Sequence, residues 1–280
     1  GISYYGMNQL QVSSLQPPHL TAMCIWEGAA DYYRDMGHHG GIFCNGFARG
    51  WPEMQVYTVQ NGRGTRGFRS RMNGDMVSGP ETLTEEELGS NRNDFGQDVF
   101  SNKLATDEFW TSRMPDYSKI NVPLLSSANW GGQGLHPRGN FEGYERSASN
   151  QKWLEVHGIE HWTEFYTDYG VGLQKKFFGH FLKGEDTGWK EQAPVLLQVR
   201  HVGEKFVERT ENEWPLARTQ WTKFYLHTED HNLDLNPPSA KGSVTYDALG
   251  DGVTFITAPF EAETELTGPM AAKLFVSSET

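Results

Sequence analysis

The chain opens on Gly1-Ile2-Ser3-Tyr4-Tyr5-Gly6, and this stretch decides its fold. A serine between two glycines is typical of a nucleophile elbow, the sharp turn from strand to helix that is usually written G-x-S-x-G. The glycines let neighbouring backbones approach closely. Here the second glycine comes one residue late, and no residues precede Gly1 to form the strand before the elbow. We therefore expect a fragment that begins at an elbow and is insoluble or inactive when expressed alone.

Composition narrows the class of protein. The 280 residues include 36 Asp and Glu against 24 Lys and Arg, a net charge of −12 that argues against nucleic acid or an anionic membrane as a partner. The sequence has no run of about 18 apolar residues, so we expect no membrane span. Two cysteines make neither a disulfide framework nor a zinc site. We expect a cytoplasmic protein without a metal or cofactor, and a homo-oligomer is left open.

The stretches after the elbow predict a helix, a strand and then an insertion. Residues 7–15 suit a helix that ends before a Pro-Pro pair. Leu20–Trp26 is a continuous apolar run, typical of a strand buried on both faces of a parallel sheet. From about residue 31 to 117 the chain is rich in glycine, arginine, asparagine and aromatics, with a helix start at Thr84 and a capping box with Glu87. This composition, together with the helix start, predicts an inserted, largely helical cap.

The sheet pattern resumes after the insertion. Strand and helix patterns then alternate, which predicts a parallel sheet flanked by helices. The strands are expected at 122–128 and 152–157, and the helices at 139–149 and 172–182.

The last third of the chain has a different pattern. Short strands separated by turn residues, without any helical pattern, indicate a separate all-β domain of sandwich type; they are expected at 195–202, 220–227, 243–246 and 252–257. The sequence thus predicts four segments: core over 1–31, cap over 32–118, core again over 119–190, and a truncated β-domain over 191–280.

A nucleophilic serine needs a base within hydrogen-bond reach, because a free hydroxyl is a weak nucleophile at neutral pH. Behind such an elbow the chain order is Ser, acid, His, with the histidine after the last sheet strand. His161 follows the strand over 152–157 and is our candidate base. His157 is its nearest rival, although a strand end favours a structural role. The pair His38-His39 lacks the third ligand of a metal site.

Further stretches carry a family resemblance: Leu15-Gln-Pro-Pro-His-Leu20, Trp26-Glu-Gly28, Asp31-Tyr-Tyr-Arg34, Gly134-Leu-His-Pro-Arg-Gly139 and His161-Trp162. With the elbow, they resemble the cocaine esterase / X-Pro dipeptidyl-peptidase-like family of α/β hydrolases (CocE/NonD type) over almost the whole chain. The resemblance implies an α/β-hydrolase core, an inserted helical cap and a C-terminal jelly-roll domain.

The resemblance also implies an activity and roles for three residues. The activity is cleavage of a small-molecule ester or a short peptide through an acyl-enzyme. Ser3 would be the nucleophile and His161 the general base. The backbone N–H of Tyr4 would supply one donor of the oxyanion hole.

Two departures from the family pattern bear on catalysis. The family's second oxyanion donor is a tyrosine upstream of the elbow, outside this chain. The family's acid is an aspartate after the strand over 122–128, whereas the loop over 129–134 has no carboxylate. Glu27 is a candidate acid because it follows the preceding strand; Gln133 could orient the histidine as a neutral group, and Glu160 or Glu164 are further candidates. The alternative is a catalytically impaired relative that serves binding or scaffolding.

Two further features concern the substrate pocket. Trp130 and Trp162 lie in the loops expected to border the serine, so we predict them as pocket walls. The basic cluster Arg63, Arg66, Arg69 and Arg71 could bind a substrate carboxylate, but an ion-paired cap surface is the favoured interpretation.

Overall fold

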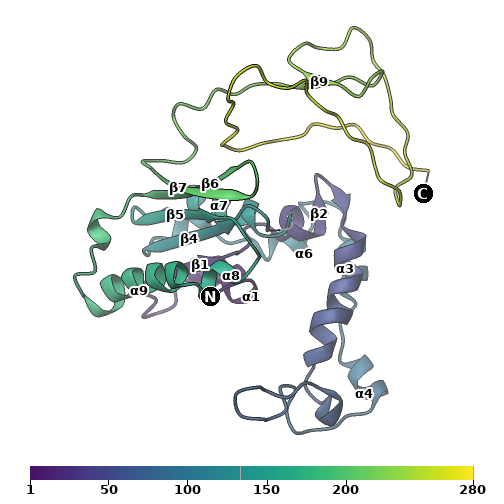
Figure 1. Cartoon of the computed structure of the whole chain (residues 1–280). Coiled ribbons are helices and arrows are strands. Elements are labelled where there is room, and N and C mark those ends of the chain that lie inside the picture. The colour runs from purple at the N-terminus through teal and green to yellow at the C-terminus, as the bar shows by residue number, and fades with distance from the viewer. Residues whose placement is uncertain (133, 280) are drawn as a thin grey trace. The chain divides into compact units, whose positions relative to one another are not determined.

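A computed structural model describes residues 1–132 and 134–279 of the chain (Figure 1). These residues divide into two compact units, Gly1–Glu211 and Asn212–Thr280. Within the described ranges, no helix is long and apolar enough to cross a membrane. The predicted segment boundaries at 31/32, 118/119 and 190/191 stay a prediction.

The first unit is built on a five-stranded sheet in the order β1-β4-β5-β6-β7. The first four strands run parallel, as the α/β pattern predicts, and β7 pairs antiparallel with β6. Every residue of β1 and β4 is buried, as expected of strands covered on both faces. The strands are β1 Met23–Trp26, β4 Leu124–Asn129, β5 Lys152–His157, β6 Val195–His201 and β7 Lys205–Glu211.

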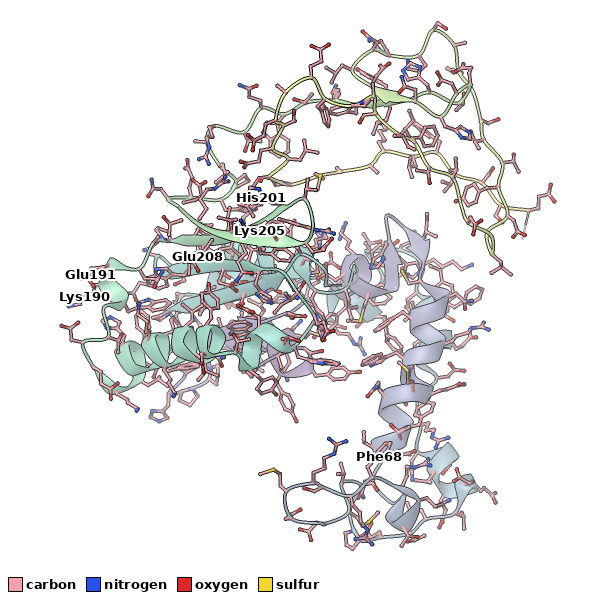
Figure 2. All side chains as sticks on the ribbon, in the orientation of Figure 1. Phe68, Lys190, Glu191, His201, Lys205 and Glu208 are labelled. Atoms are coloured by element: carbon pink, nitrogen blue, oxygen red, sulfur yellow. The ribbon has the colours of Figure 1, made fainter. Side chains whose placement is uncertain are left out.

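One predicted strand has a pairing partner that the sequence pattern did not indicate. Residues 195–202 read as the first strand of the C-terminal β-domain, but β6 pairs in parallel with β5 and completes the core sheet. Short strands look alike in either setting, and only the pairing partner distinguishes them. The edge strand β7 carries charged side chains, including Lys205 and Glu208 (Figure 2), and such charges discourage pairing with another chain.

The elbow continues the sheet beyond β1. Ile2 forms a parallel bridge with Trp26, and the N–H of Ser3 donates to the carbonyl oxygen of Trp26 at 3.1 Å. The residues before the serine thus lie in strand-like pairing beside β1. The predicted helix over 7–15 is present as two short helices, α1 Tyr4–Met7 and α2 Gln9–Ser14.

Side chains of β1 alternate between two hydrophobic clusters, one on each face of the sheet. Met23 and Ile25 pack with Leu10 of α2. Cys24 and Trp26 pack on the other face, against helix α9 Asp168–Lys183, which lies along that face in Figure 1. Helix α7 Pro137–Arg146 contacts β4 and β5. Together these layers make the helix–sheet–helix arrangement of an α/β-hydrolase core.

The insertion consists of short helices and one small antiparallel strand pair, separated by irregular stretches. Its capping box is present, since the Thr84 hydroxyl accepts from the N–H of Glu87 while the Glu87 carboxylate accepts from the N–H of Thr84. Tyr33, Ala48, Val99 and Trp110 form its own buried cluster. Its elements are η1 Tyr33–Gly37, β2 His38–His39, β3 Ile42–Phe43, α3 Asn45–Trp51, η2 Pro52–Val56, η3 Tyr57–Val59, η4 Gly64–Arg66, α4 Glu85–Ser90, α5 Phe95–Ser101, α6 Glu108–Thr111 and η5 Tyr117–Lys119.

The second unit contains little regular structure among residues 212–279. Strand β8 Tyr225–Leu226 pairs antiparallel with β9 Leu233–Asp234, and Asn232 bridges Ile256. The strand predicted over 220–227 therefore corresponds to β8, while 243–246 forms no strand in this part of the chain that the structure describes. The jelly-roll assignment stays a prediction.

Candidate active site

The backbone at Ser3 has the geometry that an elbow requires. Its φ is +56° and its ψ is −120°, a left-handed conformation that a residue with a side chain adopts only under constraint. Helix α1 begins at the next residue. A Cβ on Gly6 would lie 2.4 Å from the Trp26 carbonyl oxygen, and one on Gly1 would lie 2.6 Å from the Cβ of Tyr5. Close packing thus explains both glycines, even though the second comes one residue late.

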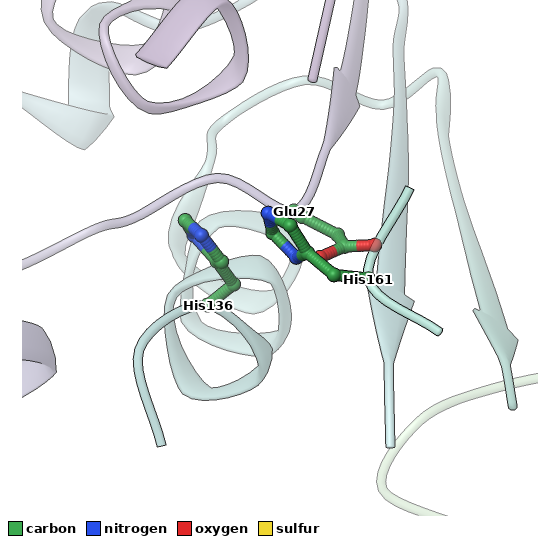
Figure 3. Close-up of side chains that lie close together, drawn as sticks. All are labelled: Glu27, His136 and His161. Atoms are coloured by element: carbon green, nitrogen blue, oxygen red, sulfur yellow. The ribbon is translucent and has the colours of Figure 1, made fainter. Parts of the chain in front are cut away.

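Glu27 is the acidic group that contacts His161. It follows β1 directly, its N–H donates to the Ser127 carbonyl oxygen at 2.8 Å, and its side chain is completely buried. Its Oε2 contacts Nδ1 of His161, which follows β5 (Figure 3). Carboxyl ends of parallel strands meet at one edge of the sheet, so β1 and β5 bring these two side chains together.

Glu27 is ionised at neutral pH. Burial alone would raise the pKa of its carboxyl group, but hydrogen bonding to His157 and His161 outweighs burial and holds the pKa below its ordinary value. Glu27 therefore presents a buried negative charge to Nδ1 of His161.

His157, the rival base, lies in the interior between two carboxylates. Its Nδ1 is 2.9 Å from Glu155 Oε2, and its Nε2 is 3.6 Å from Glu27 Oε1, with all three side chains fully buried. Burial alone would lower the pKa of His157, but Glu155 and then Glu27 outweigh it and raise the pKa to about 9. A buried, protonated imidazolium is a poor base, so the structural role expected for His157 is the one its surroundings favour.

Asn129 holds the loop that carries His161. It ends β4 and is fully buried, and its Nδ2 donates to the carbonyl oxygens of Gly158 and Ile159 at 3.2 and 3.1 Å. Its Oδ1 accepts from the N–H of Gly131 at 2.6 Å. A neutral amide thus anchors the histidine loop near the strand end where the family pattern places an aspartate.

His136 is a neighbour of His161 that the sequence analysis did not single out. It precedes α7, its ring stacks on that of His161 with centroids 4.9 Å apart, and its Nδ1 lies 2.9 Å from the Gly28 carbonyl oxygen. Burial lowers the pKa of His136, so the stacked ring is neutral at pH 7. The signal available beforehand was its place in the family-like stretch 134–139.

One ligand atom from each of Glu27, His136 and His161 lies within 4.8 Å of the others, which is compatible with a metal ion. The direct contact between Glu27 and His161 engages both groups already. The arrangement therefore favours a paired carboxylate and histidine.

The other candidate acids have different partners. Glu160 Oε2 accepts from the Thr163 hydroxyl at 3.2 Å, and Glu164 Oε1 accepts from Gln198 Nε2 at 3.2 Å. Gln133 lies outside the described residues.

A cavity of about 440 Å³ lies next to Ser3 and Tyr4. The Tyr4 hydroxyl accepts from Trp51 Nε1 of the cap at 2.5 Å, which ties the cap to the elbow. The cavity walls come from the elbow, the cap and Leu135: Ser3, Tyr4, Met7, Met36, Phe47, Trp51, Pro52, Val56, Tyr57, Gln60, Asn91, Arg92, Asn93, Phe95 and Leu135.

The two tryptophans predicted as pocket walls are not among these lining residues. Trp130 Nε1 donates to the Gln198 carbonyl oxygen of β6 at 2.8 Å, which holds the indole against the sheet. Trp162 packs edge-on against His161 with centroids 4.5 Å apart and is 54% exposed.

The predicted basic cluster does not line the cavity either. Arg66 pairs with Glu85 at 2.6 Å, and Arg69 donates to the Gly74 carbonyl oxygen at 3.0 Å. The cavity-lining arginine, Arg92, lay outside the predicted cluster.

Comparison with known proteins finds two family profiles and two solved structures that are similar to the chain. A profile of the X-Pro dipeptidyl-peptidase (S15 family) matches residues 1–163, and one of the X-Pro dipeptidyl-peptidase C-terminal non-catalytic domain matches residues 187–280. Two solved structures of a CocE/NonD family hydrolase from Staphylococcus aureus are 35% identical to the chain, with a TM-score of 0.66 over 84% of it. The chain spans 37% and 38% of the length of these two structures. None of the curated proteins matches the chain significantly.

Proposed function

The chain belongs to the X-Pro dipeptidyl-peptidase (S15) family, and from this premise we propose that it supplies the nucleophile and base of a serine hydrolase that cleaves esters or amides. The substrate is a small-molecule ester or a short peptide. The C-terminal region, which matches the family's non-catalytic domain, forms a jelly roll in the intact protein.

The mechanism assigns one step to each residue. Ser3 Oγ attacks the substrate carbonyl carbon while His161 Nε2 accepts the hydroxyl proton. Glu27 holds the histidine through Nδ1, which keeps the proton on that nitrogen and stabilises the imidazolium that forms. His161 then gives the proton to the leaving group, which departs and leaves the acyl group on Ser3 Oγ. Water attacks this ester while His161 accepts a proton from it, and His161 returns the proton to Ser3 Oγ as the acid product leaves.

The backbone N–H of Tyr4 stabilises the oxyanion. It begins helix α1, and it has no acceptor within residues 1–132 and 134–279. One such donor contributes about 3–4 kcal/mol in the transition state.

The contact of Glu27 Oε2 with His161 Nδ1 is the observation that carries this proposal. The alternative, an impaired relative that only binds, was motivated by the missing aspartate. Glu27 places a buried, ionised carboxylate at Nδ1 of His161, and the triad requires an acid at this nitrogen and not a particular residue type. The missing aspartate is therefore no argument for the alternative.

A fluorophosphonate probe tests the proposal on the intact protein. We expect covalent labelling that is abolished by Ser3→Ala and retained by Ser90→Ala, a control on the exposed end of α4. Labelling that persists in Ser3→Ala, or no labelling of a protein that is folded by circular dichroism, would overturn it.

A further inference from the structure

The cavity beside Ser3 is apolar where the reacting acyl group would enter. Met7 follows the elbow, and Met36, Phe47, Phe95 and Leu135 complete this wall. Met7 and Met36 belong to one buried cluster against which Phe47, Phe95 and Leu135 pack. If the proposed function holds, this wall receives the acyl chain, and it favours carbon over charge next to the scissile bond.

The cavity also has a polar end, which Gln60, Asn91, Arg92 and Asn93 form. The chain runs from Trp51, which is bonded to Tyr4 beside the nucleophile, through two short helices to Gln60. At about 1.5 Å per residue, nine helical residues cover about 13 Å. The polar residues therefore lie within the reach of a long acyl chain that enters at the elbow.

Arg92 is a fixed positive charge at this end. Its guanidinium lies 4.4 Å from the centroid of the Tyr57 ring, and its Nε donates to Gln60 Oε1 at 2.8 Å. The side chain is only 24% exposed, and its nearest carboxylate oxygen, on the exposed Glu85, is 4.0 Å away. Stacking and hydrogen bonding hold the guanidinium in place, and its Nη2 makes only a long ion pair with Glu85, at 4.0 Å.

Among the described residues that line the cavity, none is Asp or Glu. An ammonium group at the polar end would meet the charge of Arg92 and lose its hydration without gaining a carboxylate partner. A carboxylate there would gain charge-assisted hydrogen bonds from Arg92 and further bonds from the two asparagine amides.

We propose that this cavity selects an apolar acyl chain that ends in a carboxylate and rejects one that ends in an ammonium group, so that a dipeptide with a free amino terminus is a poor substrate. The inference rests on the proposed function and narrows its substrate class.

Three p-nitrophenyl esters with eight-carbon acyl chains test the proposal on the intact protein: octanoyl, 7-carboxyheptanoyl and 8-aminooctanoyl. We expect kcat/KM for the carboxylate ester to exceed that for the ammonium ester by about tenfold to a hundredfold, the range of one charge-assisted hydrogen bond. Arg92→Gln should reduce this ratio about tenfold, and Arg92→Lys should retain part of it. Arg69→Gln, which removes the same charge from the cap away from the cavity, should leave the ratio as it is.

The outcomes separate this inference from the function on which it rests. Suppose that the fluorophosphonate labels Ser3. If the ammonium ester is then cleaved as fast as the carboxylate ester, or if neither of these two esters is cleaved, the inference is wrong while the proposed serine hydrolase is retained. The inference is also wrong if Arg92→Gln and Arg69→Gln alter the ratio equally. If Ser3 is not labelled and none of the three esters is cleaved, the proposed function fails first. Loss of octanoyl turnover in Arg92→Gln would indicate a damaged cap. In that case the ratio of kcat/KM for the carboxylate and ammonium esters, measured in Arg92→Lys, decides whether the inference holds.

Discussion

The carboxylate of Glu27, at the end of β1, contacts Nδ1 of His161, in the loop after β5. The two residues belong to strands separated by β4 in the sheet, and they meet because the carboxyl ends of the three strands lie along one edge. An acid can therefore reach the histidine from a strand other than the one that the family pattern indicates.

Removing the charge of Glu27 tests that relationship. We expect Glu27→Gln to reduce kcat on a p-nitrophenyl ester by about 10³–10⁴-fold, because an amide no longer fixes the tautomer of His161 or stabilises its imidazolium. Steady-state kinetics of the intact protein measure this effect. The matched control is Glu160→Gln, which removes a carboxylate beside His161 in sequence and should leave kcat within a few-fold of its original value. Equal loss in both variants would contradict the assignment.

His157 should make stability depend on pH. Its pKa is raised to about 9 from an unfolded value near 6.5, so its contribution is complete below about pH 6.5 and is lost as pH rises through 9. The shift corresponds to about 3 kcal/mol. Thermal unfolding of His157→Gln should show a lower Tm at pH 6.5 and a smaller fall in Tm between pH 6.5 and 9.5. His180→Gln, in the last turn of α9, is the matched control.

The close approach at Gly6 predicts a severe backbone effect. Gly6→Ala would place a Cβ 2.4 Å from the Trp26 carbonyl oxygen, which cannot move without disturbing the edge of the sheet. We expect lost fluorophosphonate labelling and a Tm lowered by several degrees. Gly172→Ala serves as the control, since a Cβ there meets nothing within 4 Å and alanine favours the helix by about 1 kcal/mol. A Gly6→Ala protein with normal labelling would refute the packing argument.

Asp35 links the start of the insertion to the core through Arg138. Its buried carboxylate accepts from the N–H groups of Ala30 and Asp31 at 2.8 Å and from Arg138 at 2.7 Å. We expect Arg138→Met to lower the free energy of unfolding by about 1–3 kcal/mol, less than for a fully buried pair because Arg138 is 41% exposed. Urea unfolding measures this change. Lys119→Met breaks an exposed pair with Asp116 and should have little effect; a comparable loss there would contradict this reasoning.

The parts of the fold that could be predicted from sequence are those with local signals. The elbow carries its glycines, and the capping box at Thr84 is complete within four residues. Strand β6 was expected within the C-terminal β-domain, and its pairing with β5 could not be predicted because its local pattern is the same in either setting. Pairing partners are a non-local property that one sequence does not display.

The site shows the same division. Ser3 and His161 were predicted from motif and position, whereas Glu27 was one of several candidate acids, because the choice depends on how three strands align. The walls of the cavity beside Ser3 also depend on non-local structure: Trp130 and Trp162 flank the expected strands, but this cavity is lined by cap residues such as Trp51, whose positions follow from irregular structure. His136 was missed although it lies in the family-like stretch 134–139, because its stacking on His161 is a non-local contact.

The anchoring role of Asn129 has a consequence for how this catalytic edge can evolve. If a single aspartate followed β4, one side chain would both position the histidine loop and polarise the imidazole ring. In this chain the amide of Asn129 binds the histidine loop, and the carboxylate of Glu27 contacts the imidazole ring of His161. The contacts of Asn129 do not depend on Glu27, so the histidine loop can stay bound to the end of β4 when the acid after β1 is replaced.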